Sequence, residues 1–215
     1  MEWHSTQNEA YLREITSRGA SQSLSWCKQV VSLLSEGGLT EEFKVNDFGC
    51  QYFQLYKEFD ARGLGGIDYF GYDIDPSYLK LGKTLFPKLA TSSAQADVTD
   101  GNSIREADAS IISATLEHIG NYDDALSVLE AKTRKTLIIR SFFGSQYENF
   151  LAKQVSAERS YPIQQFVLDD MIYPRFKDWS AKVLQDDATE SMPVVKILEN
   201  GCVTRTTFLL VLERI

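Results

Sequence analysis

Hydrophobic and polar positions along the chain follow two periods, one typical of strands and one typical of helices. Short apolar runs are bounded by glycine, proline or acidic residues, as buried strands are. Between these runs, apolar residues recur every three or four positions, as on one face of a helix. Strands are expected at residues 43–47, 69–72, 88–96, 109–115, 135–141 and 181–184. Helices are expected at residues 53–59, 76–85, 122–131 and 163–176. This alternation predicts an α/β fold with a mostly parallel sheet.

The first part of the chain, residues 1–36, has the three-to-four spacing of amphipathic helices. A break near Gly19 divides the pattern into two helices, and Gly37 ends the second. We therefore expect an N-terminal helical lid or cap over residues 1–40. Packing on the sheet and closing over a ligand site both fit this segment.

The end of the chain carries the clearest turn signal. Asn200-Gly201 lies between two β-rich runs, residues 194–198 and 203–212, and predicts an antiparallel hairpin. A reversed strand at the end of a parallel sheet is a known variation. Before the hairpin, polar and aromatic residues indicate an insertion over about residues 142–176 of an α/β domain that spans residues 41–215.

Composition narrows the class of protein and its partners. The 215 residues, 43% hydrophobic and 24% charged, suit one globular domain. The net charge of -8 and the lack of a basic cluster argue against nucleic acid as a partner. No signal peptide or membrane-spanning run is evident, so we expect a cytoplasmic protein without a membrane partner. Cys27, Cys50 and Cys202 lack metal-ligand spacing, so free thiols and no metal are expected.

Residues 44–76 combine a strand, a glycine turn, a helix and a second strand. The first strand ends at Asp47 just before Gly49, and the second ends 26 positions later at Asp73. This βαβ arrangement is typical of nucleotide-binding sheets, whose ligand lies beyond the carboxyl ends of the strands. Asp47 is an acid at the end of a strand shortly before a glycine, and this position favours contact with a ligand over capping of the next helix. Asp75, in contrast, is expected to cap the helix that follows it.

Four stretches of the chain resemble motifs of the class I S-adenosylmethionine-dependent methyltransferases. They are Val45-Asn46-Asp47-Phe48-Gly49-Cys50, Gly71-Tyr72-Asp73-Ile74-Asp75-Pro76, Ala96-Asp97-Val98 and Ser113-Ala114-Thr115-Leu116-Glu117-His118-Ile119. The correspondence covers residues 43–213 in order and in spacing. The resemblance implies a Rossmann-like, seven-stranded, mostly parallel sheet with an antiparallel C-terminal hairpin and helices on both faces. It also implies S-adenosyl-L-methionine as the cofactor and methyl transfer as the activity.

The resemblance assigns cofactor contacts to the loops that follow the first four strands. The backbone at Gly49 would approach the methionine part, Asp73 would accept from the ribose hydroxyls, and Asp97 would accept from the adenine amino group. The expected cofactor-binding residues are Asp47, Gly49, Gln51, Tyr52, Asp73, Ile74, Asp97, Val98, Thr115 and Glu117. The family's first motif has three alternate glycines, and Gln51 and Phe53 replace two of them here. Phe53 must either pack under the following helix or intrude on the cofactor.

The acceptor molecule is expected near residues that follow the fourth and fifth strands. The expected substrate-binding residues are Arg140, Phe142, Phe143, Tyr161 and Gln165. Arg140 could instead pair with a nearby acid, and the aromatic residues could form a satellite hydrophobic cluster. His118 is the candidate general base, because a neutral imidazole can accept a substrate proton. Packing behind the cofactor is the alternative for His118, and Glu117 is expected to contact the cofactor or to orient its loop.

We therefore expect O- or N-methylation of a small molecule or sugar-like biosynthetic intermediate, and a homodimer stays open. Methyl transfer from a sulfonium needs mainly an in-line approach of the nucleophile, so few catalytic groups are required. The alternative is an inactive methyltransferase-like binding or regulatory scaffold, because two glycines of the first motif are replaced. A nicotinamide-dependent dehydrogenase is a further alternative, weakened by the absence of the GxGxxG pattern.

Overall fold

The computed structural model describes residues 17, 23–154, 159–187, 194–198 and 201–215. The first expected helix and the turn at residues 199–200 lie outside the described residues. The helices are α2 (Ser25–Glu36), α3 (Gln54–Ala61), α4 (Pro76–Leu85) and α5 (Tyr122–Lys132), with short helical turns η1 (Pro87–Leu89), η2 (Gly101–Ser103), η3 (Leu116–His118) and η5 (Leu168–Ile172). The strands are β1 (Lys44–Phe48), β2 (Asp68–Asp73), β3 (Ser93–Gln95), β4 (Ala107–Ser113), β5 (Thr133–Phe142), β6 (Glu148–Gln154), β7 (Arg159–Gln165), β8 (Trp179–Gln185), β9 (Val194–Leu198), β10 (Gly201–Arg205) and β11 (Thr207–Arg214). Within this described part of the chain, no helix combines the length and the apolar character needed to cross a membrane.

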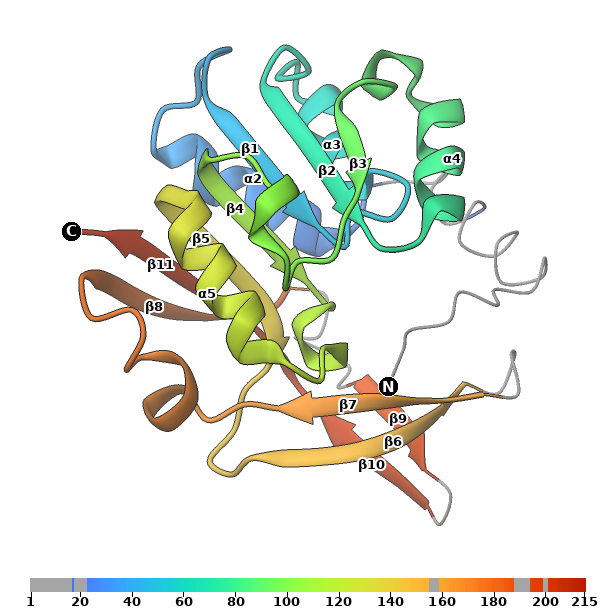
Figure 1. Ribbon diagram of the computed structural model, residues 1–215, viewed down its shortest axis with the longest axis vertical. Helices are drawn as coiled ribbons and strands as arrows, with labels where there is room; N and C mark the ends of the chain where they lie inside the picture. Colours follow the sequence, from blue (N-terminus) through green and yellow to red (C-terminus); the bar gives the residue numbers. More distant parts are fainter. Residues whose placement is uncertain (1–16, 18–22, 155–158, 188–193, 199–200) are drawn as a thin grey trace.

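Seven strands form the main sheet in the order β3-β2-β1-β4-β5-β11-β8 (Figure 1). The first five strands of the chain pair in parallel. β11 runs antiparallel to both of its neighbours, β5 and β8, so β8 has the same direction as β5. The predicted Rossmann-like, seven-stranded and mostly parallel sheet is confirmed.

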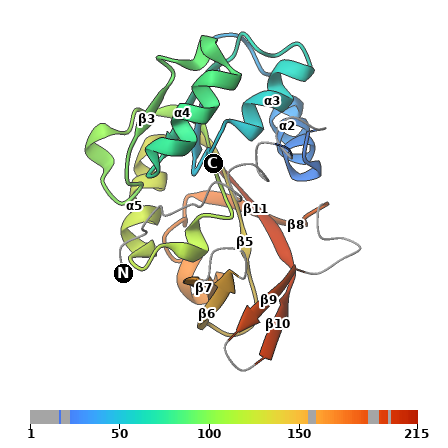
Figure 2. The same ribbon diagram turned by 90° about the vertical axis from the view of Figure 1, so that its right-hand side faces the viewer.

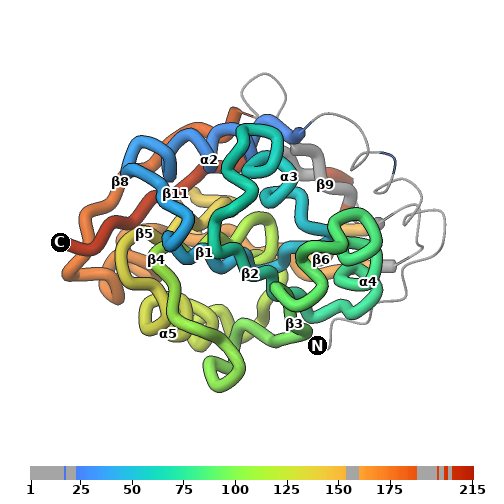
Figure 3. The backbone as a smooth tube through the Cα atoms, turned by 90° about the horizontal axis from the view of Figure 1, so that it is seen from above, coloured from blue at the N-terminus to red at the C-terminus, as the bar shows by residue number. Residues whose placement is uncertain are grey.

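Successive residues of the central strands point to opposite faces of this sheet, and both faces are apolar. Ile111 and Ile138 belong to the core on one side, and Ile112 and Ile139 belong to the core on the other. The view from above shows α2 and α3 on one side of the row of strands and α5 on the other (Figure 3). Burial on both faces explains why these strands are continuous apolar runs rather than alternating ones.

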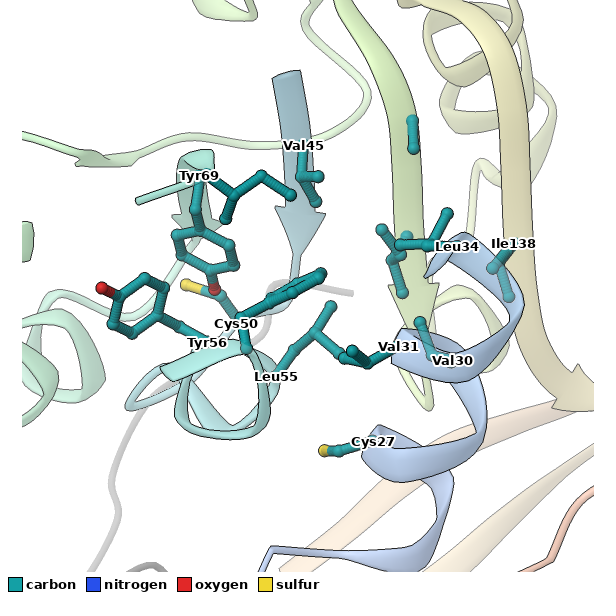
Figure 4. Close-up of a cluster of buried hydrophobic side chains, with 14 of the residues drawn as sticks. Cys27, Val30, Val31, Leu34, Val45, Cys50, Leu55, Tyr56, Tyr69 and Ile138 are labelled. Carbon is teal, nitrogen blue, oxygen red and sulfur yellow. The ribbon is translucent and has the colours of Figure 1, made fainter. Parts of the chain in front are cut away.

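The helix α2 packs on the sheet through one apolar stripe. Its buried residues, Cys27, Val30, Val31 and Leu34, follow helical spacing. They form one cluster with Leu55 of α3 and with Val45 and Ile138 of the sheet (Figure 4). The Gln29 side chain donates to the Gln185 carbonyl (2.9 Å) and accepts from the Asp187 N–H (3.1 Å). α2 is therefore joined to the far edge of the sheet as well as to its centre.

A second sheet has the order β10-β9-β6-β7 and lies beyond the carboxyl ends of β1 and β4 (Figures 1 and 2). Its strands come from the segment after β5 and from the hairpin before β11. Gly201 pairs with Leu198, so the predicted hairpin forms, but in this second sheet. The single strand predicted over residues 203–212 is instead two strands, divided at Thr206 and placed in different sheets.

The helix predicted over residues 163–176 is wrong. β7 includes the residues up to Gln165, and only the short π turn η5 is helical. In β7, Ile163 pairs with Phe150 of β6, a contact that no local pattern reveals. Pro162 fits because β7 is an edge strand, where a missing N–H leaves no partner unsatisfied.

Candidate cofactor and acceptor site

The loop between β1 and α3 contains three alternate residues with positive φ. The angles are 69° at Gly49, 49° at Gln51 and 67° at Phe53. Left-handed backbone costs roughly 1–2 kcal/mol for a residue with a side chain, so Gln51 and Phe53 adopt it only because their surroundings impose it. The loop thus follows the path expected of three glycines, although two of them are replaced.

The Phe53 ring is fully buried beneath this loop. It meets the ring of Tyr69 edge to face, with 6.2 Å between the centroids. A Cβ atom on Gly71 would lie 2.9 Å from the Phe53 ring, and one on Gly82 would lie 2.7 Å from it. The ring therefore occupies space that two glycines, one on β2 and one on α4, leave open. The Phe53 ring is therefore packed in the interior between β2 and α4.

The tip of the loop is fixed to the ends of the neighbouring strands. The N–H groups of Gly49 and Cys50 both donate to the Tyr72 carbonyl, at 2.8 and 3.0 Å. A Cβ atom on Gly49 would collide with the side chain of Thr115, which follows β4, so only glycine fits at this position. The loops after β1, β2 and β4 therefore meet at one point of the sheet edge, as the resemblance implies.

Asp73 ends β2 and binds the loop through its carboxylate. Its Oδ2 accepts from the Gln51 N–H at 2.9 Å, and its Oδ1 accepts from the Asp75 N–H at 2.8 Å. Burial raises the pKa of Asp73 to about 6, opposed by these amide hydrogen bonds. A carboxylate offers about four acceptor positions, so acceptor capacity remains for the hydroxyls of a ribose.

Two neighbours of Asp73 complete the end of β2. Asp75 caps α4 by accepting from the Ser77 N–H at 2.8 Å, which confirms its predicted role. Its other oxygen, Oδ2, is buried and has no hydrogen-bond partner in the part of the chain that the structure describes. Ile74 is 43% exposed and presents an apolar side chain where the resemblance expects the adenine ring.

A surface groove of about 440 Å³ adjoins this region without including Asp73. Its lining residues are Pro76, Leu79, Lys80, Lys83, Thr84 and Gln95. The Gln95 side chain donates to the Ile74 carbonyl at 3.1 Å, so the groove borders the end of β2. No residue that lines it is among the expected site residues, so the groove lies beside the expected cofactor site.

Asp47 lies in the interior, between the sheet and α2. Its Oδ2 accepts from the Tyr69 hydroxyl at 2.6 Å, and both side chains are buried. Burial raises the pKa of Asp47 to about 7, and the hydrogen bond from Tyr69 opposes this rise. Burial, with a smaller contribution from Asp47, also raises the pKa of Cys27 on α2. The hydrogen bond from Tyr69 to Asp47 therefore links the side chains of β1 and β2 in the interior.

The loop after β3 presents one exposed acid and one buried apolar residue. Asp97 accepts from the N–H and the hydroxyl of Thr99, at 2.9 and 2.8 Å, through its Oδ1. Val98 is buried against the core beneath α5. Their positions are those at which the resemblance expects contacts to the adenine.

The three residues of η3 are held by three different parts of the fold. Leu116 is fully buried in the core. Glu117 is also buried, and its Oε2 accepts from the Ser141 hydroxyl of β5 at 2.9 Å. The Nδ1 of His118 lies 2.7 Å from the Pro162 carbonyl oxygen of β7. Glu117 therefore orients this loop, one of the two roles expected of it.

Arg140 forms an ion pair with Asp186. Its Nε and Nη2 donate to Asp186 Oδ2 at 3.0 and 2.6 Å, and the Asp186 side chain is fully buried. The guanidinium also lies over the ring of Trp26 on α2, 5.5 Å from its centroid. Pairing with a nearby acid is therefore the alternative that the structure shows for Arg140.

The other expected acceptor-side residues occupy two regions. Phe142 and Tyr161 belong to a small cluster on the second sheet, the satellite cluster that the sequence left open. Phe143 instead belongs to the core under α5. Gln165 donates to the Gln146 carbonyl at 3.0 Å.

Sequence reasoning missed the partners that hold the site residues in place. They are Tyr69, Ser141, Pro162 and Asp186. Glycines inside a helix and a strand, Gly82 and Gly71, did carry a signal, because such glycines mark a close approach of another group. Cys27, Cys50 and Cys202 are free thiols. Among the described residues, no three His, Cys, Asp or Glu side chains are grouped to hold a metal.

Comparison with known proteins identifies the fold. No protein-family model matches the sequence, and no curated protein matches it. An S-adenosylmethionine-dependent methyltransferase from Clostridium acetobutylicum is similar in structure, with a TM-score of 0.61, 12% identity, and coverage of 94% of this chain and 96% of that one. CalS10, an amino pentose methyltransferase from Micromonospora echinaspora involved in calicheamicin biosynthesis, has a TM-score of 0.58, 13% identity and 100% coverage of both chains.

The glycopeptide N-methyltransferase MtfA, in complex with S-adenosyl-L-methionine, is similar with a TM-score of 0.58, 7% identity, and coverage of 88% of this chain and 94% of that one. All three likenesses combine near-complete coverage with low identity. The chain therefore has the fold of the class I S-adenosylmethionine-dependent methyltransferases.

Proposed function

We propose that this protein transfers a methyl group from S-adenosyl-L-methionine to a small-molecule acceptor. The observation that carries the proposal is the β1–α3 loop, which keeps positive φ at Gly49, Gln51 and Phe53. Two of these residues are strained, and backbone strain of this kind clusters at active sites and ligand-binding loops. The Asp73 carboxylate accepts a hydrogen bond from this loop and has further lone pairs, which can accept from the hydroxyls of a ribose.

The proposed cofactor contacts divide among four loops. Asp73 accepts from the ribose hydroxyls, and Ile74 flanks the adenine. Asp97 accepts from the adenine amino group, and the backbone N–H of Val98 donates beside it. The methionine part lies along the backbone of the β1–α3 loop, with Gly49, Gln51, Tyr52 and Thr115 around it. Asp47 and Glu117 support these loops through Tyr69 and Ser141. When bound, this cofactor supplies a methyl group that is electrophilic because it is attached to a sulfonium.

His118 is the proposed general base. Its Nδ1 faces the Pro162 carbonyl, and it lies in η3, the turn that follows β4, at the same sheet edge as the proposed cofactor loops. Phe142, Tyr161 and Gln165 are proposed to surround the acceptor. Arg140 is proposed to shape this side through its pair with Asp186 rather than to bind an anionic group.

Calorimetric titration tests the proposal. We expect the protein to bind S-adenosyl-L-methionine and its demethylated product with one site per chain, and not to bind NAD. Asp73→Ala should weaken this binding about 100-fold or more, because two hydrogen bonds to a charged acceptor are lost. Asp60→Ala is the matched control, because Asp60 is exposed and its ion pair with Lys88 contributes little.

The inactive scaffold is distinguished by the same titration. Its support was that side chains replace two glycines of the loop, and the buried position of Phe53 removes the stronger part of that support. A scaffold that has lost its cofactor site would bind neither form of the cofactor. An enzyme would bind both and would transfer a tritiated methyl group to an acceptor.

A further inference from the structure

The groove beside the end of β2 is formed by one face of α4 and by the last residue of β3. Its lining residues from α4 lie at positions 76, 79, 80, 83 and 84, which is the spacing of a single helix face. β3 is an edge strand of the main sheet, and α4 lies beside it (Figure 1). A volume of about 440 Å³ is that of a site for a small organic molecule.

The two ends of the groove differ in character. Pro76 and the buried Leu79 give the end next to β2 an apolar surface. Lys80 and Lys83 follow in the next turns of α4 and make the other end basic. Seven positions separate Pro76 from Lys83, which is about 10 Å along the helix axis. A molecule of this length can contact the apolar end and the basic end together.

The two lysines of the groove are cations without a partner. Within the described ranges of the chain, neither Lys80 nor Lys83 forms an ion pair or a side-chain hydrogen bond, whereas the neighbouring Lys88 is paired with Asp60 at 2.6 Å. Lys83 is only partly exposed, so its ammonium group has given up part of its hydration without gaining an acceptor in return. An anion in the groove would supply that acceptor.

Negative charge lies at the opposite end of the groove. Asp73 and Asp75 are at the end of β2, and Asp97 comes shortly after β3. These carboxylates would repel an anion placed next to them. The charged part of an anionic ligand is therefore directed toward Lys80 and Lys83, and its uncharged part toward Pro76 and Leu79.

We propose that this groove binds an organic phosphate monoester. Two ammonium groups match the charge of such a phosphate, about −1.5 to −2 at pH 7, and lysine binds phosphate as a point charge. The organic part lies on Pro76 and Leu79. No residue that lines the groove is among the proposed cofactor contacts, so the phosphate monoester and the cofactor bind at the same time. The proposal does not depend on methyl transfer.

Four probes test which part of the ligand is recognised. They are phenyl phosphate, inorganic phosphate, benzoate and benzyl alcohol, and calorimetry at low ionic strength measures the binding of each to the full chain. We expect phenyl phosphate to bind at one site per chain, about tenfold more tightly than inorganic phosphate, which lacks the apolar part. It should also bind about tenfold more tightly than benzoate, which has a single charge, and than benzyl alcohol, which has none.

Variants test the two lysines separately. Lys83→Gln should weaken the binding of phenyl phosphate about tenfold, because a partly buried cation is lost. Lys80→Gln should weaken it about threefold, because the side chain of Lys80 is exposed and solvent screens its charge. Lys182→Gln is the matched control, since it makes the same change of charge on β8, the opposite edge of the main sheet. It should leave the affinity unchanged.

Amide NMR spectra locate the site. The largest shifts on addition of phenyl phosphate should fall in α4 and at Gln95, and the affinity should be the same when the protein is saturated with S-adenosyl-L-homocysteine. Competition between the two ligands would assign the groove to the cofactor site and overturn the proposal. Equal weakening by Lys182→Gln, shifts spread over lysines elsewhere, or no binding of phenyl phosphate would also overturn it. A protein that binds phenyl phosphate in the groove but no S-adenosyl-L-homocysteine would remove the proposed function alone.

Discussion

The space under the β1–α3 loop makes a quantitative prediction about Phe53 and Gly82. Gly82 lies inside α4, where replacing glycine by alanine ordinarily stabilises a helix by about 1 kcal/mol. Here the new Cβ would lie 2.7 Å from the Phe53 ring, a contact that requires the ring to move. Overpacking of this kind costs typically about 1–3 kcal/mol. Gly82→Ala should therefore leave the stability unchanged or lower it by up to about 2 kcal/mol.

The sign of the effect should reverse when the ring is absent. In a Phe53→Gly background, the two closest contacts of the new Cβ are removed. The next one, with the Tyr52 Cα at 3.1 Å, can be relieved by a shift of a few tenths of an ångström. Gly82→Ala should then stabilise the protein by up to about 1 kcal/mol. The two substitutions should therefore be coupled by about 1–3 kcal/mol. Phe53→Gly alone is expected to destabilise, because a buried aromatic ring is removed, even though a left-handed residue becomes glycine.

Urea unfolding of the wild type, the two single variants and the double variant measures this coupling. Gly120→Ala is the control, because a Cβ there would meet nothing within 4 Å. It should change the free energy of unfolding by less than about 0.5 kcal/mol. Additive effects of Phe53→Gly and Gly82→Ala, within about 0.5 kcal/mol, would refute the packing described here.

Three further predictions concern buried polar groups. The pKa of Asp47 is about 7 in the folded protein and 3.8 as its ordinary value. Between pH 4 and pH 7 the unfolded chain therefore loses this proton more readily than the folded protein does, so the free energy of unfolding falls as the pH rises. Asp47→Asn should therefore gain stability relative to wild type between pH 4 and pH 8, by at most about 4 kcal/mol, and parallel pH curves in urea unfolding would contradict this. Ser141→Ala should lower the free energy of unfolding by about 1–3 kcal/mol, because buried Glu117 loses a donor, and a change below about 0.5 kcal/mol would count against that bond. Arg140→Met should destabilise the protein by about 3–5 kcal/mol, because the buried Asp186 carboxylate loses its guanidinium partner. Adding Asp186→Val should restore most of this loss. Thermal unfolding measures both variants, and a further loss of stability in the double variant would disprove the pairing.

Local patterns were sufficient to predict the strands of the parallel part of the main sheet, whereas its seven-stranded order was implied by the family resemblance. β4 and β5 are continuous apolar runs because both faces are covered, and such runs are visible in sequence. The cap at Asp75 and the proline at position 76 likewise defined the start of α4, because both signals lie within a few residues of each other. The four motifs then indicated which loops gather at the sheet edge.

The second sheet could not be predicted, because it depends on pairing between distant segments. The segment from Tyr161 to Gln165 contains apolar and amide residues that suit either a helix or a strand, and only pairing with β6 decides between them. The same is true of the position of the His118 ring, whose Nδ1 lies 2.7 Å from the carbonyl oxygen of Pro162, 44 positions away. The position of Phe53 was left open for a similar reason, since its neighbours Gly71 and Gly82 lie on other elements.

The most direct test of the central claim is a crystal structure of the protein grown with S-adenosyl-L-homocysteine. We predict density for the ligand at the ends of β1, β2 and β4, with both ribose hydroxyls within hydrogen-bond distance of the Asp73 carboxylate. The Phe53 ring should remain between Gly71 and Gly82. A ligand bound elsewhere, or a site filled by the Phe53 ring with no ligand density, would contradict the account.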